Sequence, residues 1–318
     1  MAMELILATA GFDHTIRLWH PHNATCFRKL QHANSQVNQL AISNDGKQLG
    51  AAGYEHVRLY DITSPSPYPT TTYSKLQKEK NVTSLGFNPS SQWMFTAGEE
   101  GLACVWDLRT SQCQRKLKIS SAINSAVLHP DQAQLLLASQ DGECIRWDLR
   151  TDKQDVFYSS RCTSVHSIAV NIIATQIAAL DSKGSLLLWD TNDLTTISAQ
   201  SKPHLARGLK VTFSRDCKYL ATTASDKCAK ISSAEADTLL DVVTVFSVEE
   251  QKWVWDAVFS ASSRYLFTAS SDGTVRLWDR EKPNTPKQEY MAHQKAVVSI
   301  AFWDKEDHVL ESDSIIEE

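Results

Sequence analysis

The sequence lacks the signatures of the common catalytic and cofactor-binding sites. It has no phosphate-binding GxxxxGK[ST] or GxGxxG loop, no HExxH zinc motif and no GxSxG nucleophile motif. The ten histidines are scattered, and the close pair His20 and His22 has no further ligands at zinc spacing and is typical of solvated side chains. We therefore expect a protein that is not an enzyme, with no catalytic residues, no metal site and no cofactor.

Other features are also scarce. The seven cysteines are odd in number and lack repeated CxxC spacing, which indicates reduced thiols that fill strands. No apolar run approaches the ~18 residues of a membrane span. The opening residues 1–10 have no basic start and include Glu4, which favours a strand over a signal peptide. The net charge of −5 disfavours nucleic acid as the main partner. These features predict a cytoplasmic protein that is not inserted in a membrane.

A short phrase ending in an aromatic residue recurs along nearly the whole chain. Its last residues are Trp19, Tyr60, Trp106, Trp147, Trp189, Ser232 and Trp278. The spacings of 41, 46, 41, 42, 43 and 46 residues match the period of a four-stranded propeller blade. Within one unit, strands are expected at 81–87, 93–97, 102–106 and 112–117, the last polar enough for an outer edge. The pattern predicts an all-β fold, a seven-bladed WD40 β-propeller.

The two ends of the chain predict how the ring closes. The first unit lacks its inner strand, because 5–10 is already a second strand, followed by strands at 15–19 and 26–30. The missing strand is at 296–302, which has no second and third strands after it. We therefore expect the C-terminal strand to pair with the N-terminal strands. Residues 1–304 would form a single propeller, and 305–318 an acidic C-terminal tail.

A polar network is expected at the same closure. WD-type blades often contain a hydrogen-bonded set of His, Ser or Thr, Asp and Trp. In the first blade these would be His293, Thr9, Asp13 and Trp19, a structural tetrad, and no other blade has all four. In the sixth blade Ser232 replaces the Trp, which predicts a looser sheet.

Function is expected at the mouth of the ring, where the inner strands begin. Aligning these strands places Gln36, Asn38, Asn81, Trp253 and Trp255 on one face. The two tryptophans occupy positions where the other blades have mainly small or polar residues. Aromatic side chains near solvent dominate interface energetics, which favours a partner contact. Alternatively, the tryptophans plug the channel or pack on a neighbouring blade.

Several segments together resemble one family. These are residues 7–19, 35–38, 51–56, 98–100 with 105–109, the Trp-Val-Trp of 253–255 and the His-Gln-Lys-Ala-Val-Val of 293–298. They are similar to the small WD-repeat subunit of TOR kinase complexes, the GβL or Lst-eight family, over all seven blades in order. Ser232 and the acidic tail depart from that pattern.

The resemblance implies a non-catalytic scaffold shared by TOR complexes one and two, which supports nutrient and growth signalling. It would bind and stabilise the kinase domain by docking on a helical insertion of the C-lobe, and other TOR complex subunits would also be partners. The contact residues would be Gln36, Asn38, Asn81, Trp253 and Trp255. The protein would be cytoplasmic and recruited to endolysosomal or vacuolar membrane surfaces through the kinase complex.

The residues alone leave two other classes of protein possible. Another WD40 interaction adaptor, such as a ubiquitin-ligase substrate receptor or a Gβ-like scaffold, would share the fold. A Gβ-like protein would be expected to have a long N-terminal helix, and none fits before Leu5. A propeller enzyme would need clustered acids or histidines in the channel, where the aligned ring has only His166 and Arg207.

Overall fold

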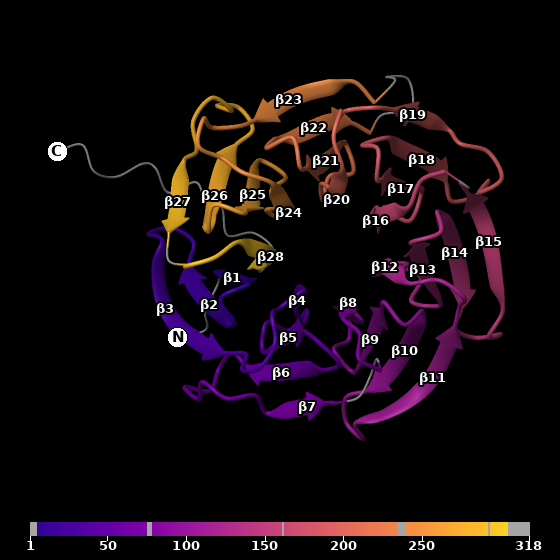
Figure 1. Ribbon diagram of the computed structural model, residues 1–318, viewed down its shortest axis with the longest axis horizontal. Helices are drawn as coiled ribbons and strands as arrows, with labels where there is room; N and C mark the ends of the chain where they lie inside the picture. The colour runs from indigo at the N-terminus through magenta and orange to yellow at the C-terminus, as the bar shows by residue number, and fades with distance from the viewer. Residues whose placement is uncertain (1–4, 75–77, 161, 235–239, 292, 305–318) are drawn as a thin grey trace.

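The computed structural model describes residues 5–74, 78–160, 162–234, 240–291 and 293–304. This part of the chain contains 28 β-strands and no helix. The strands form seven antiparallel sheets of four strands each, arranged as blades around a central axis (Figure 1). The predicted seven-bladed β-propeller is confirmed. The predicted acidic tail, 305–318, lies outside the described residues.

Each blade has its first strand at the axis and its fourth strand at the rim (Figure 1). In the order of blades one to seven, the inner strands are β28 (Val297–Asp304), β4 (Gln39–Ile42), β8 (Val82–Phe87), β12 (Ile123–Leu128), β16 (Val165–Val170), β20 (Gly208–Phe213) and β24 (Val254–Phe259). The second strands are β1 (Leu5–Gly11), β5 (Gln48–Ala52), β9 (Trp93–Gly98), β13 (Gln134–Ser139), β17 (Gln176–Asp181), β21 (Tyr219–Ala224) and β25 (Tyr265–Ser270).

The outer half of each blade completes the sheet. The third strands are β2 (Thr15–His20), β6 (Val57–Asp61), β10 (Leu102–Asp107), β14 (Glu143–Asp148), β18 (Leu186–Asp190), β22 (Ala229–Ser233) and β26 (Thr274–Asp279). The fourth strands are β3 (Thr25–Gln31), β7 (Thr71–Tyr73), β11 (Gln112–Lys118), β15 (Gln154–Ser159), β19 (Ala199–Ser201), β23 (Val242–Phe246) and β27 (Gln288–Met291).

The hydrophobic core lies between neighbouring blades. The second strands are almost entirely buried, because both of their faces are covered by the adjacent sheets. Trp147, Trp189 and Trp278 are fully buried in this core. The fourth strands are largely exposed, and charged side chains such as Arg115 on β11 discourage pairing with other chains.

The ring closes through the two ends of the chain, as predicted. Strand β28 pairs with β1 in antiparallel register, with Leu7 opposite Phe302 and Thr9 opposite Ile300. Figure 1 shows β28 next to β1, on the axis side of blade one. A Cβ atom at Gly11 would lie 2.0 Å from the backbone oxygen of Ala296, so this close approach requires glycine.

Blade one brings the four residues of the expected tetrad together. The indole N–H of Trp19 donates to Thr9 Oγ1 at 2.8 Å, and Thr9 Oγ1 lies 2.7 Å from Nε2 of His293. His293 Nδ1 lies 2.9 Å from Asp13 Oδ2. Burial alone would raise the pKa of Asp13, but its interactions with His293 and Thr15 hold that pKa well below its usual value.

Blade six contains three of the four groups of such a network. His204 lies 2.8 Å from Asp226 Oδ2 through Nδ1 and 2.9 Å from Thr222 Oγ1 through Nε2. Ser232, fully buried opposite Leu220, stands where the tryptophan would donate to the threonine. The Ser232 hydroxyl has no hydrogen-bond partner among the described residues. The sequence did not indicate the role of His204, because blade six lacks the tryptophan that completes the tetrad.

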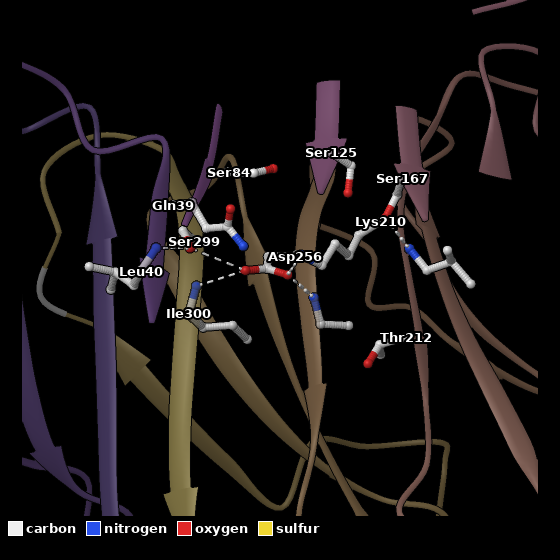
Figure 2. A network of polar contacts seen from close by, with 12 residues as sticks. Gln39, Leu40, Ser84, Ser125, Ser167, Lys210, Thr212, Asp256, Ser299 and Ile300 are labelled. Carbon is white, nitrogen blue, oxygen red and sulfur yellow. Dashed lines mark hydrogen bonds and ion pairs between the residues drawn. The ribbon is translucent and has the colours of Figure 1, made fainter. Parts of the chain in front are cut away.

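A second polar network joins the inner strands around the channel (Figure 2). In six blades a side chain on the inner strand accepts the backbone N–H of the next inner strand. The acceptors are Gln39, Ser84, Ser125, Ser167, Asp256 and Ser299, and the donors are Leu85, Ala126, Ile168, Val211, Ile300 and Leu40. Six of the seven junctions between neighbouring blades are therefore hydrogen-bonded at the axis in this way.

Blade six breaks this pattern because its residue at the same position is Lys210, which has no acceptor atom. Asp256 of the next blade compensates. Its Oδ1 accepts the N–H of Ala257 at 2.9 Å, and its Oδ2 accepts the N–H of Ile300 at 2.9 Å. Lys210 Nζ lies 3.8 Å from Asp256 Oδ1. Figure 2 shows the Lys210 side chain reaching toward this carboxylate.

Candidate protein-binding face

The inner strands begin at a common mouth, which contains a cavity of about 340 Å³. Residues from all seven blades line it. Of the predicted contact residues, Gln36, Asn38, Asn81 and Trp255 line this cavity. Trp253 does not line it but contacts Trp255, with ring centroids 5.7 Å apart. The structure therefore gathers the five predicted residues into one face, with Trp253 at its edge.

The three amide side chains of this face form a connected chain of hydrogen bonds. Gln36 Nε2 donates to Asn38 Oδ1 at 3.0 Å, and Asn38 Nδ2 donates to Asn81 Oδ1 at 3.3 Å. Asn81 Nδ2 in turn donates to the Glu99 carboxylate at 3.2 Å. These contacts fix the three amides in one orientation.

Side chains at the start of four inner strands hold neighbouring blades together at the mouth: Asn38 lies directly before β4, and the other three are the second residues of β8, β12 and β16. Each donates to a backbone oxygen of the next inner strand. The pairs are Asn38 to Val82 at 3.1 Å, Thr83 to Ile123 at 2.7 Å, Asn124 to Val165 at 2.8 Å and His166 to Gly208 at 2.7 Å. The mouth is therefore a rigid platform from blade two to blade six.

The two tryptophans have different environments. Trp253 is 46% exposed. Trp255 is half-buried, and its indole N–H donates to Ser271 Oγ at 2.6 Å. Its ring also contacts the edge of Phe12 in blade one, with centroids 6.2 Å apart. The alternative of packing on a neighbouring blade thus describes Trp255, whereas Trp253 presents its ring to solvent.

A basic group lies across the mouth from Glu99. Arg207 Nη2 lies 3.1 Å from His166 Nε2, and His166 Nδ1 donates to the Gly208 carbonyl. Burial lowers the pKa of His166; its bond to Gly208 opposes this shift, and the nearby Arg207 charge adds to it. The neutral imidazole therefore acts as an acceptor for Arg207. Chemically, the face offers amides, one carboxylate, one guanidinium and indole surface, which suits protein recognition.

Sequence reasoning missed Phe12 and Glu99, which both lie in turns between the second and third strands of their blades. The sequence contained the information needed to find them, because the turn between the second and third strands lies at the same end of each blade as the start of the inner strand.

Among the described residues, no group of three or more His, Cys, Asp or Glu side chains could hold a metal ion. The seven cysteines are free thiols. The sequence suggested that all of them fill strands, and four do. The other three, Cys162, Cys217 and Cys228, lie in the connections between strands.

Comparison with known proteins identifies the family. The family model for the WD domain, G-beta repeat, matches residues 70–107 and 241–279. The chain is 38% identical over 313 residues to the target of rapamycin complex subunit LST8 of Mus musculus, covering 94% of this chain and 95% of that protein. The chain belongs to the LST8 family.

The similarity to this family extends across eukaryotes. The LST8 subunit of Saccharomyces cerevisiae is 36% identical over 75% of this chain and 80% of its own length. The LST8-1 subunit of Arabidopsis thaliana is 37% identical over 79% of this chain and 82% of its own length. Within the described part of the chain, no helix has the length and apolar character needed to cross a membrane.

Proposed function

We propose that this protein is a non-catalytic WD40 subunit of TOR kinase complexes one and two. The observation that carries the proposal is its 38% identity, over 94% of the chain, to a protein named as a subunit of the target of rapamycin complex. In this role the propeller binds and stabilises the kinase domain and so supports nutrient and growth signalling. It would be cytoplasmic and reach endolysosomal or vacuolar membrane surfaces through the kinase complex.

The proposed docking face consists of Gln36, Asn38, Asn81, Trp253 and Trp255. Its partner would be a helical insertion in the C-lobe of the kinase domain. The exposed ring of Trp253, 46% accessible, provides the apolar area, and Trp255 packs against it at a centroid distance of 5.7 Å. An aromatic side chain held in one position loses little entropy on binding, so its burial contributes strongly to affinity.

The test is to replace Trp253 by alanine and to measure co-purification and affinity with the TOR kinase. Truncating a hot-spot aromatic commonly costs about 2–4 kcal/mol, which corresponds to a roughly 30-fold to nearly 1,000-fold weaker complex. The melting temperature should change little, because Trp253 lies at the edge of the mouth and is 46% exposed. Adding Trp255→Ala should abolish co-purification, although this second change also removes contacts with Phe12 and Ser271.

Two matched controls distinguish the face from the rest of the surface. Tyr68 is an aromatic residue that is 70% exposed, in the loop between β6 and β7 at the opposite end of the blades. Tyr68→Ala, and Arg115→Glu with Lys116→Glu on the outer strand β11, should leave binding unchanged. If Trp253→Ala folds and binds with wild-type affinity, docking through this face is refuted.

A further inference from the structure

The outermost strand of blade six differs in composition from the other outer strands. Strand β23 reads Val-Val-Thr-Val-Phe and contains no charged residue, proline or glycine. Of the other described outer strands, β3, β11, β15 and β27 contain charged side chains, and β7 and β19 have only three residues each. Charge and shortness are common ways of protecting an edge strand from pairing with other chains, and β23 has neither.

The outer edge of β23 has no neighbouring strand in the described part of the chain. Blade six has the strand order β20-β21-β22-β23, so that among the described strands β23 pairs with β22 alone. Figure 1 shows β23 along the rim of the ring, with β22 on its axis side. In an antiparallel pair only some of the backbone N–H and carbonyl groups point toward the partner strand, and the others point outward. The rim of blade six therefore presents outward backbone groups.

The backbone of β23 resembles that of protected outer strands. Thr244 lies opposite Ile231, and Val242 lies opposite Ser232. Val243 is therefore an extra residue, which forms a β-bulge. Strands β3 and β11 have a register shift at the same position of their blades, one residue before the end of the recurring phrase. The side chains, and not the bulge, thus distinguish β23 from these strands.

The side chains of β23 divide between a buried and an exposed face. Phe246 is fully buried and packs on Trp278 of blade seven, with ring centroids 5.3 Å apart. Val245 precedes Phe246 in the strand and therefore points to the opposite face. Val245 is 45% exposed, and Val243 is 59% exposed. Phe246 thus anchors the strand to the core, while the two valines leave apolar surface at the open edge.

Acidic residues flank the strand at both ends. Asp241 directly precedes it, Glu249 and Glu250 follow it, and all three are exposed. Lys230, which lies opposite Val245 on β22, is 3.9 Å from Asp226 and so does not neutralise these flanks. A partner segment with basic residues at its ends complements this charge, whereas an acidic segment is repelled. The apolar centre favours β-branched residues, which form good cross-strand pairs.

We propose that the outer edge of β23 binds an extended segment of another protein, which adds a fifth strand to blade six. The backbone of the segment hydrogen-bonds to the outward groups of β23, and its β-branched side chains cover Val243 and Val245. Its basic ends lie near Asp241 and Glu249. None of these residues lines the cavity at the mouth, so a partner on β23 does not occupy the proposed docking face for the kinase.

The experiment titrates the full chain into a fluorescein-labelled synthetic peptide, Lys-Arg-Thr-Val-Thr-Val-Thr-Val-Lys, and follows fluorescence anisotropy. Wild-type protein should bind this peptide. Val245→Lys should weaken binding roughly tenfold or more, because a lysine on an edge strand opposes the addition of another strand. The matched control is Val156→Lys on the outer strand β15, where the valine is 53% exposed, and it should leave binding unchanged.

Two changes of the peptide distinguish strand pairing from general apolar or ionic contact. N-methylation of its central amides removes the backbone donors but keeps the valines, and it should abolish binding. Replacing its basic residues by glutamate should weaken binding. Asp241→Lys should then reduce the preference for the basic peptide by roughly twofold to fivefold, the effect of one exposed charge pair.

Hydrogen exchange identifies the strand that binds. The peptide should slow amide exchange in β23 and not in β15. Because Val245 is partly exposed, Val245→Lys should keep the wild-type melting temperature. A folded Val245→Lys protein with wild-type affinity would overturn the assignment, and so would wild-type protein that binds no peptide or binds the N-methylated peptide equally well.

Sedimentation velocity without peptide tests a second copy of the chain as the occupant of this edge. Wild-type protein and Val245→Lys should both sediment as monomers. Self-association of the wild type that Val245→Lys abolishes would assign the edge to a second copy and overturn the proposed partner.

Discussion

The Lys210–Asp256 pair makes a quantitative prediction. Among the seven described inner strands, six provide an acceptor for the next blade, and Lys210 does not. Asp256 therefore binds the N–H groups of both Ala257 and Ile300. Serine at both positions would restore the pattern of the sister blades. We predict that Lys210→Ser and Asp256→Ser are each destabilising and that the double variant is close to wild type.

The magnitude follows from the groups left without partners. Asp256→Ser leaves the Ala257 N–H without an acceptor, because serine can replace only the bond to Ile300; an orphaned buried donor costs about 1–3 kcal/mol. It also removes the ion-pair partner of Lys210, whose side chain is 31% exposed at 3.8 Å, so solvent relieves most of that loss. The expected cost is about 2–4 kcal/mol.

Lys210→Ser leaves a buried carboxylate without its cation. Burial already raises the pKa of Asp256, against the opposing effects of Lys210 and the bonds to Ile300, Ala257 and Ser299. A carboxyl whose folded-state pKa is raised contributes stability at low pH, which is lost as pH rises through that pKa. The Lys210→Ser variant should therefore lose more stability at pH 7 than at pH 4. The double variant, which has no carboxyl here, should not show this contribution.

The assay is urea unfolding followed by tryptophan fluorescence, evaluated as a double-mutant cycle. Coupled neighbours show interaction energies of about 0.5–3 kcal/mol, and we expect a value in the upper part of that range. The double variant should unfold within about 1 kcal/mol of wild type, since its serines would bond as Ser167 and Ser299 do. A double variant that loses the sum of the two single losses would refute the reasoning.

Two further predictions concern the polar networks of single blades. His293→Ala should destabilise the protein by about 1–3 kcal/mol, because Thr9 and Asp13 lose a buried partner. The pKa of Asp13 is held below its usual value, so the stability that the wild-type carboxylate contributes declines as pH falls from the usual aspartate range toward that lowered pKa. The loss caused by the substitution should therefore be smaller at pH 2 than at pH 7, and an equal loss at both would contradict this. Amide exchange should be faster across β21 and β22 than across β25 and β26, because Ser232 leaves the space that Trp278 fills, and equal protection would mean that neighbours have repacked it.

The sequence predicted the parts of the fold that repeat at fixed spacing. The third strands were predicted because six of the seven recurring phrases end in an aromatic residue, and the closure because strand 296–302 had no second and third strands after it. Thr9, Asp13, Trp19 and His293 could be grouped because their spacing is typical of the repeat. These features depend on local patterns, and local patterns are readable from one chain.

The contacts that the sequence did not reveal join different blades. Lys210 and Asp256 lie in separate repeats, and only the register of adjacent inner strands brings them within 3.8 Å. The packing of Trp255 on Phe12 likewise crosses the closure between blades seven and one. In each case the missing information was the lateral alignment of neighbouring sheets.

The same alignment divides the proposed docking face into two halves. From blade two to blade five, the side chain at the corresponding position near the start of each inner strand donates to the next blade, from Asn38 through to His166. The equivalent side chains of blades six, seven and one are the apolar Leu209, Trp255 and Val298, which line the cavity together with Phe12 and beside the charged Arg207, Lys210 and Asp256 of blades six and seven. A partner that fills both halves needs one polar and one apolar side, which an amphipathic helix provides. This supports a helical element of the kinase as the proposed partner, with its apolar side over the tryptophans and its polar side over the amide chain.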